Sequence, residues 1–127
     1  MNRTDTVIMK KRRSSVINSK QKGKRGELEL VHELNERGYN TRRTAQYCGN
    51  TGDASDLVGI PGVHIECKVR EKHNIYDYIE QVDRDKKDNE LGCVFIKSNR
   101  KKWLVLMDLD DWCNMHRYYN NLGGTNG

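Results

Sequence analysis

The segment that most constrains this chain is residues 55–68, which reads as two short strands joined by a Pro-Gly turn. Residues two apart in a strand point to the same face of a sheet. Glu66 and Lys68 therefore project together, while the apolar residues that alternate with them point the other way, into a core. Asp56 stands at the start of the first strand. Two acids and a lysine on a rigid hairpin can bind a hard metal ion and activate a water molecule.

The rest of the chain fits one domain in a reducing compartment. At 127 residues it has the length of a single domain. No apolar run approaches membrane-spanning length, and no apolar stretch follows the basic N-terminal residues, so neither a membrane helix nor a secretory signal is expected. The four cysteines form no zinc-ligand spacing, and we interpret them as small hydrophobic residues. The sequence predicts a cytoplasmic protein.

The net charge of +5 is unevenly distributed. Residues 1–25 contain nine Lys or Arg and one acid, whereas the remaining 102 residues contain fourteen basic and seventeen acidic groups. Basic character is thus a property of the N-terminal segment. Such a segment either contacts nucleic acid phosphates or is a solvated, disordered leader, and the sequence leaves both open. We predict a basic arm over 1–21, a folded domain over 22–120 and a flexible tail over 121–127.

One acid on the first predicted helix differs from its neighbours. Apolar residues at helical spacing predict this helix over residues 24–37, with Gly38 as its stop. Glu27 lies three and four residues before Leu30 and Val31, so it shares their inward-facing side. A buried carboxylate is unfavourable unless it is paired or binds a metal. We therefore expect Glu27 to face the Asp56–Glu66 cleft.

The remaining pattern predicts a mixed sheet flanked by helices. We expect a strand over 39–44, a loop over 45–54, the hairpin over 56–69, a helix over 75–90 ended by Gly92, strands over 93–97 and 103–107, and a last helix capped by Asp108 or Asp110. The order α-β-β-β-α-β-β-α places the chain in the α/β (α+β) class. Trp103 and Trp112 are expected in the core, and His64 is interpreted as an incidental residue at a strand end.

Taken singly, the charged residues have ordinary explanations. Asp56 is a common turn residue, and Glu66 and Lys68 would form an ion pair on a solvated sheet. Their combination with an inward-facing Glu27 weakens those explanations, because all four belong to one arrangement.

This arrangement resembles the PD-(D/E)xK nuclease superfamily, and most closely archaeal-type Holliday junction resolvases and phage-borne endonucleases. Ser55-Asp56 stands in place of Pro-Asp, and Glu66-Cys67-Lys68 matches (D/E)xK. The likeness covers about residues 22–107 and extends to other segments in the same order, namely Lys22 to Glu27, Arg42-Arg43, Gly49 to Gly52, Gln81 and Lys102-Trp103.

The resemblance implies a restriction-endonuclease-like fold and a Mg²⁺-dependent endodeoxyribonuclease, with Mn²⁺ as a substitute ion. It implies metal ligation by Asp56 and Glu66 with help from Glu27, a water-orienting role for Lys68 and an auxiliary role for Gln81. DNA contacts are expected from Lys22, Lys24, Arg25, Arg42 and Arg43. The expected substrate is branched DNA such as a Holliday junction, cut by a homodimer in a bacterial or phage-infected cell. The alternative is a DNA-binding module of phage or mobile-element origin with weak or no cleavage.

Overall fold

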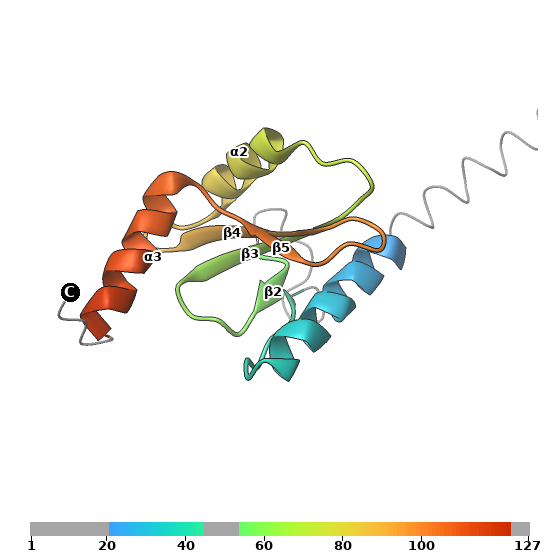
Figure 1. Ribbon diagram of the computed structural model, residues 1–127, viewed down its shortest axis with the longest axis horizontal. Helices are drawn as coiled ribbons and strands as arrows, with labels where there is room; N and C mark the ends of the chain where they lie inside the picture. Colours follow the sequence, from blue (N-terminus) through green and yellow to red (C-terminus); the bar gives the residue numbers. More distant parts are fainter. Residues whose placement is uncertain (1–20, 45–53, 123–127) are drawn as a thin grey trace, which may run out of the picture.

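The computed structural model describes residues 21–44 and 54–122, which form one mixed sheet with helices packed against it (Figure 1). The elements are, in chain order, an N-terminal helix over residues 21–36, β1 (Arg42–Arg43), β2 (Leu57–Val58), β3 (Val63–Val69), α2 (Ile75–Asp85), β4 (Leu91–Lys97), β5 (Leu104–Leu106) and α3 (Leu109–Leu122). The predicted order of elements is confirmed. The basic arm up to residue 20, most of the 45–54 loop and residues 123–127 of the tail lie outside the described residues.

The five strands are arranged in the order β1-β2-β3-β4-β5. Neighbours pair antiparallel except β3 and β4, which are parallel and are joined through α2. Leu57 of β2 lies opposite Ile65 of β3, as the predicted hairpin requires. This pairing brings the start of β2 beside the middle of β3, where Glu66 lies.

The two faces of the sheet carry separate parts of the core. On one face the N-terminal helix packs Leu30 and Leu34 against Leu57 and Ile65. On the other face α2 packs Tyr78 and Val82 against Val94. The sheet is thus covered on both sides along β3 and β4, so Glu66, on the α2 face of β3, is enclosed, and Lys68 is partly buried.

Three sequence expectations need correction. Gly92 does not end a helix; α2 stops at Asp85 because Lys86 adopts an extended backbone, and Gly92 lies within β4. The glycine instead lets α2 approach, since an added Cβ would lie 3.1 Å from a methyl group of Val82. The strand expected over 39–44 is limited to β1. Trp112 is 47% exposed on α3 and is not a core residue.

Asp111 attaches α3 to the sheet. Its backbone N–H donates to Asp108 Oδ1 (2.7 Å), which caps the helix, and its own Oδ2 accepts the backbone N–H of Gly92 (2.9 Å). The Asp111 side chain is buried.

Within the described residues, no helix has the length and apolar character needed to cross a membrane.

We expect Asp111→Ala to destabilise the fold, because it leaves the buried N–H of Gly92 without an acceptor. The expected loss is about 1–3 kcal/mol in the free energy of unfolding, measured by urea denaturation. Asp110→Ala, one residue earlier and exposed, is the matched control and should change stability little. Equal effects of the two substitutions would show that the Asp111–Gly92 bond does not hold α3.

Candidate active site

Asp56 is held at the start of β2 by hydrogen bonds to the backbone of β3. Its N–H donates to the carbonyl of Ile65 (2.7 Å), and its Oδ2 accepts the N–H of Cys67 (2.8 Å). The preceding Ser55 hydroxyl accepts the N–H of Ile65 (2.8 Å), and its single hydrogen faces the carbonyl oxygens of Leu57 (2.6 Å) and Ile65 (3.0 Å). Ser55 therefore serves as a structural link between β2 and β3, and it fixes Asp56 against β3.

The environment of Asp56 is strongly acidic. Burial, followed by the charge of the neighbouring Glu66 carboxylate, raises the pKa of Asp56 from 3.8 to about 7. The hydrogen bond from Cys67 opposes this shift, while the charge of Glu27 adds to it. Two carboxyl groups that repel each other in a buried place favour either a proton or a cation between them. The geometry thus brings together the two acids that the sequence singled out.

Glu66 is buried, which rules out the ordinary explanation of it as half of an ion pair on a solvated sheet. Only 4% of the residue is exposed, and its Oε1 lies 2.8 Å from Nε2 of His64, which is 2% exposed. This hydrogen bond with Glu66 is the main reason that the pKa of His64 is raised above its ordinary value. His64 is therefore not incidental: it contacts a carboxylate of the candidate site directly.

Lys68 projects from β3 beside Tyr78 of α2. Its Nζ lies 5.5 Å from the centre of the Tyr78 ring, and the guanidinium of Arg70 lies 5.7 Å from the same ring. The Tyr78 hydroxyl is hydrogen-bonded to Nδ1 of His73 (2.9 Å). A cation over an aromatic ring is attracted to its electron-rich face. An anchored ring therefore supports two positive charges at the end of β3.

Glu27 lies on the inner side of the N-terminal helix, close to the hairpin. Gly26 allows this approach, since a Cβ there would come within 2.7 Å of a methyl group of Val69. The Glu27 side chain is 19% exposed, and its Oε1 accepts a hydrogen bond from Nε of Arg43 (2.7 Å). Arg43 is 12% exposed, so its charge is directed at Glu27 and not at the outer surface where a DNA contact was expected.

The side chains at this position are compatible with a divalent cation coordinated by Asp56 and Glu66. Carboxylate oxygens are the ligands that Mg²⁺ prefers. A cation bound there would also offset the burial and the charge of Glu66 that raise the pKa of Asp56. Glu27 is engaged by Arg43. Across residues 21–44 and 54–122 there is no group of three or more His, Cys, Asp or Glu side chains placed to hold an ion together.

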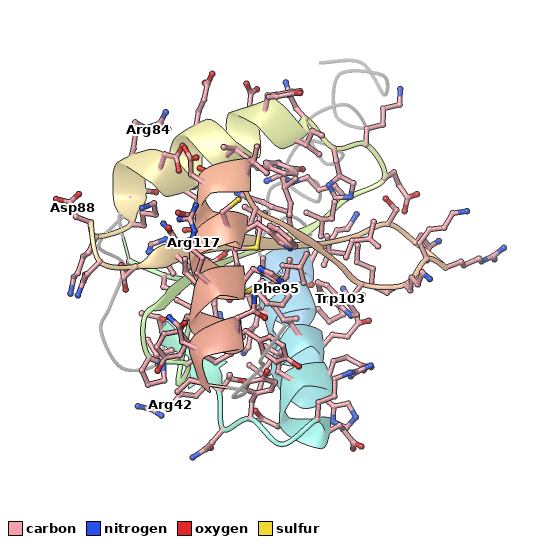
Figure 2. All side chains as sticks on the ribbon, turned by 60° about the vertical axis from the view of Figure 1, so that its left-hand side comes forward. Arg42, Arg84, Asp88, Phe95, Trp103 and Arg117 are labelled. Carbon is pink, nitrogen blue, oxygen red and sulfur yellow. The ribbon has the colours of Figure 1, made fainter. Side chains whose placement is uncertain are left out.

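The other DNA-binding candidates occupy the surface near the helix start. Lys22, Lys24 and Arg25 are exposed there. A groove of about 400 Å³ runs between the helix start and the end of β3, and is lined by Lys22, Gly23, Cys67, Lys68, Val69 and Arg70. Arg42 is exposed and lies at the outside of the molecule (Figure 2). Gln81 is half-buried on α2, one turn after Tyr78.

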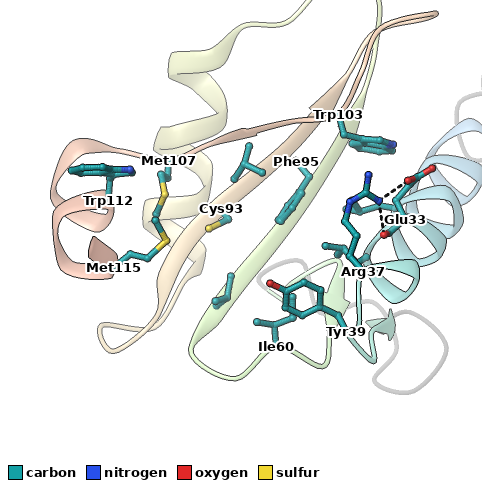
Figure 3. A pocket seen from close by; sticks show the side chains of 14 residues that line it. Glu33, Arg37, Tyr39, Ile60, Cys93, Phe95, Trp103, Met107, Trp112 and Met115 are labelled. Carbon is teal, nitrogen blue, oxygen red and sulfur yellow. Dashed lines mark hydrogen bonds and ion pairs between the residues drawn. The ribbon is translucent and has the colours of Figure 1, made fainter. Parts of the chain in front are cut away.

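A second, apolar groove of about 630 Å³ lies on the face of the sheet that is turned away from α2, between the N-terminal helix and α3 (Figure 3). Phe95, Cys93 and Trp103 form part of its floor, and Trp112 and Met115 of α3 form one wall. Arg37, paired with Glu33 at 2.7 Å, borders the other side. None of the candidate site residues lines this groove.

Sequence reasoning missed three residues that shape the site. Strand alternation placed His64 on the face of Glu66, but its burial depends on α2, which is distant in sequence. The support that Tyr78 gives to Lys68 likewise depends on packing between α2 and β3. Ser55 was given no role beyond standing in place of proline, although its hydroxyl group joins the two strands.

Comparison with known proteins places this geometry in a family. The family model of phage putative PDDEXK endonucleases matches residues 18–123. A solved structure of Hjc, a Holliday junction resolvase from the archaeal hyperthermophile Archaeoglobus fulgidus, is similar with a TM-score of 0.52 and 25% sequence identity, over 67% of this chain and 76% of that chain. No curated protein matches the chain. The likeness to Hjc confirms the predicted fold, and the chain belongs to the family of phage putative PDDEXK endonucleases.

Proposed function

We propose that this protein is a metal-dependent endodeoxyribonuclease that cuts branched DNA, in the manner of a Holliday junction resolvase. The observation that carries the proposal is the pairing of Asp56 with Glu66 on adjoining strands, with Lys68 two residues further along β3. The family supports nuclease chemistry, and the similarity to Hjc supports a branched substrate. We place its action in the cytoplasm of a bacterial or phage-infected cell.

Each residue has a defined task in phosphodiester hydrolysis. A bound Mg²⁺, for which Mn²⁺ would substitute, supplies Lewis acidity toward the scissile phosphate and lowers the pKa of the attacking water. Asp56 and Glu66 provide carboxylate oxygens for the ion, with the backbone carbonyl of Cys67 as a further donor. Lys68 orients the water and offsets the negative charge that develops on the phosphate. Gln81 is proposed as an auxiliary residue that positions water or DNA.

DNA would approach over the groove at the end of β3. Lys22 and Arg70 border this groove together with Lys68, and Lys24 and Arg25 extend the positive surface along the helix start. Arg42 would contact the backbone farther along the sheet edge. Phosphate contacts of this kind fix the position of a duplex without reading its sequence. The basic arm would add counterion release to the same binding.

A homodimer is proposed because a four-way junction has two-fold symmetry and needs paired cuts. The apolar groove supports association, since Trp112 and Met115 leave large apolar surface exposed along α3. Exposed apolar patches of this type are common at protein interfaces. The groove is on the face opposite to α2 and is lined by none of the candidate site residues, so a partner seated there would not cover Asp56 or Glu66.

Glu27 is expected to act in the site through its charge, which acts on Asp56. We predict that Glu27→Gln lowers the cleavage rate by about 10–100-fold, because it removes a charge that helps to hold a metal-bound water and releases Arg43. Glu29→Gln is the matched control: Glu29 is 44% exposed and faces Lys97 at 3.6 Å. Single-turnover cleavage with excess protein measures both. Equal cleavage rates for the two variants would show that Glu27 has no role in the reaction.

The proposed function is tested by incubating the protein with end-labelled linear, flap and four-way DNA in the presence of Mg²⁺ or Mn²⁺. We expect cleavage that requires the metal, is abolished by EDTA and is fastest on the four-way substrate. Tight DNA binding without cleavage of any substrate would contradict the proposal, and would favour a DNA-binding module whose active site no longer functions.

A further inference from the structure

We propose that His64 is a positioning residue for Glu66, fixing one carboxylate oxygen so that the other is presented to the metal ion. This inference rests on the proposed function, because it assigns a support to one of its candidate metal ligands. His64 itself would not contact the ion or the DNA.

The hydrogen bond has a defined direction. An ionised carboxylate only accepts hydrogen bonds, so Nε2 of His64 must carry the hydrogen that lies toward Oε1 of Glu66, at 2.8 Å. Oε1 is thereby occupied by the imidazole. Oε2 is left as the atom of Glu66 that can coordinate a cation beside Asp56. Ligating carboxylates are commonly oriented by such outer hydrogen bonds, whose loss weakens metal binding.

A second carboxylate lies on the other side of the imidazole. Nδ1 lies 3.9 Å from Oε1 of Glu90, and this carboxylate is fixed by a hydrogen bond from the backbone N–H of Lys87 (2.8 Å). His64 lies opposite Gly92 of β4, against which the end of α2 packs closely. A ring that is 2% exposed and bounded on both sides has little freedom to turn. The segment between α2 and β4 therefore helps to enclose the imidazole beside the candidate active site.

A purely structural role for this buried pair makes a different prediction. If His64 only filled space, an apolar residue of similar size would preserve function as long as the fold persisted. If the N–H of His64 orients Glu66, metal binding and cleavage should be kept only by variants with a hydrogen-bond donor at the position of Nε2. Gln places an amide N–H near the position of Nε2, whereas Leu fills part of the volume and offers no donor.

The experiment compares His64→Leu and His64→Gln with the wild type in two measurements, Mn²⁺ binding by calorimetry and the Mg²⁺ concentration that gives half-maximal cleavage. His32→Leu, at an exposed position of the N-terminal helix, is the matched control. We expect His64→Leu to weaken metal affinity and raise the half-maximal Mg²⁺ concentration by about 10–100-fold. His64→Gln should recover most of this loss, and DNA affinity without metal should be unchanged in all variants.

The outcomes separate this inference from the function on which it rests. The wild type could bind metal and cleave DNA while a folded His64→Leu protein shows the same Mn²⁺ affinity and half-maximal Mg²⁺ concentration. That result would overturn the role of His64 but not the nuclease function. Equal losses in His64→Leu and His64→Gln, with equal losses of thermal stability, would show a structural role only. A wild type that binds no Mn²⁺ would overturn both proposals.

Discussion

Asp56→Asn, Glu66→Gln and Lys68→Met are each expected to reduce DNA cleavage by at least about 100–1,000-fold. The two amides keep the size of the acids but lose the charge that a divalent cation requires. Isosteric changes are needed at Glu66 because it is buried, so that alanine would leave a cavity as well as remove the carboxylate. Methionine keeps the length of Lys68 and its packing on Tyr78 but removes the positive charge.

DNA binding separates this effect from a loss of fold. Removing a carboxylate lowers the repulsion of phosphate, so the Asp56 and Glu66 variants should bind DNA as well as the wild type or better. Glu80→Gln, at an exposed position of α2, is the control and should cleave normally. The rate is measured on labelled four-way DNA under single-turnover conditions, with affinity from gel shifts. A wild-type cleavage rate in either acid variant would show that the substituted residue takes no part in the reaction.

In the absence of metal, Asp56→Asn is expected to stabilise the protein at pH 8. Asp56 has a pKa of about 7 in the fold against an ordinary value of 3.8, so the folded state binds its proton more tightly than the unfolded state. The stability that this proton provides is therefore lost as the pH rises from about 4 to about 7. Asn is neutral throughout and still offers an oxygen to the N–H of Cys67.

The expected gain at pH 8 is on the order of 1–3 kcal/mol after allowance for solvent screening, and it should be close to zero at pH 4. Urea denaturation in EDTA at the two pH values measures it. His64, whose pKa is also raised, titrates in both proteins, so the difference between them isolates Asp56. Mg²⁺ should stabilise the wild type at pH 8 more than the variant. A variant that is less stable than the wild type at pH 8 would show that the acids do not repel each other.

The parts of the fold that sequence predicted well are those that local chemistry determines. The hairpin of β2 and β3 follows from alternation around a Pro-Gly turn, and its register brings Asp56 to Glu66. Gly92 was misassigned because a glycine after a helical pattern usually ends a helix, whereas here its missing side chain admits α2. The exposed position of Trp112 depends on how far α3 lies from the sheet, which periodicity does not specify.

In the candidate site, too, local sequence predicts some features and others depend on tertiary packing. Strand alternation is enough to place Glu66, Lys68 and His64 on one face, but the burial of that face depends on α2. The ion pair between Glu27 and Arg43 joins residues sixteen positions apart through the packing of the N-terminal helix. Charges that meet only in three dimensions leave no pattern in a single sequence.

The central claim is that Asp56 and Glu66 hold a divalent cation. The most direct measurement is an anomalous difference map from a crystal of the protein soaked in Mn²⁺. We predict a peak between the two carboxylates, in contact with Oε2 of Glu66 and absent in a crystal of Asp56→Asn. Mn²⁺ bound elsewhere, with no peak between Asp56 and Glu66 in the wild type, would contradict it.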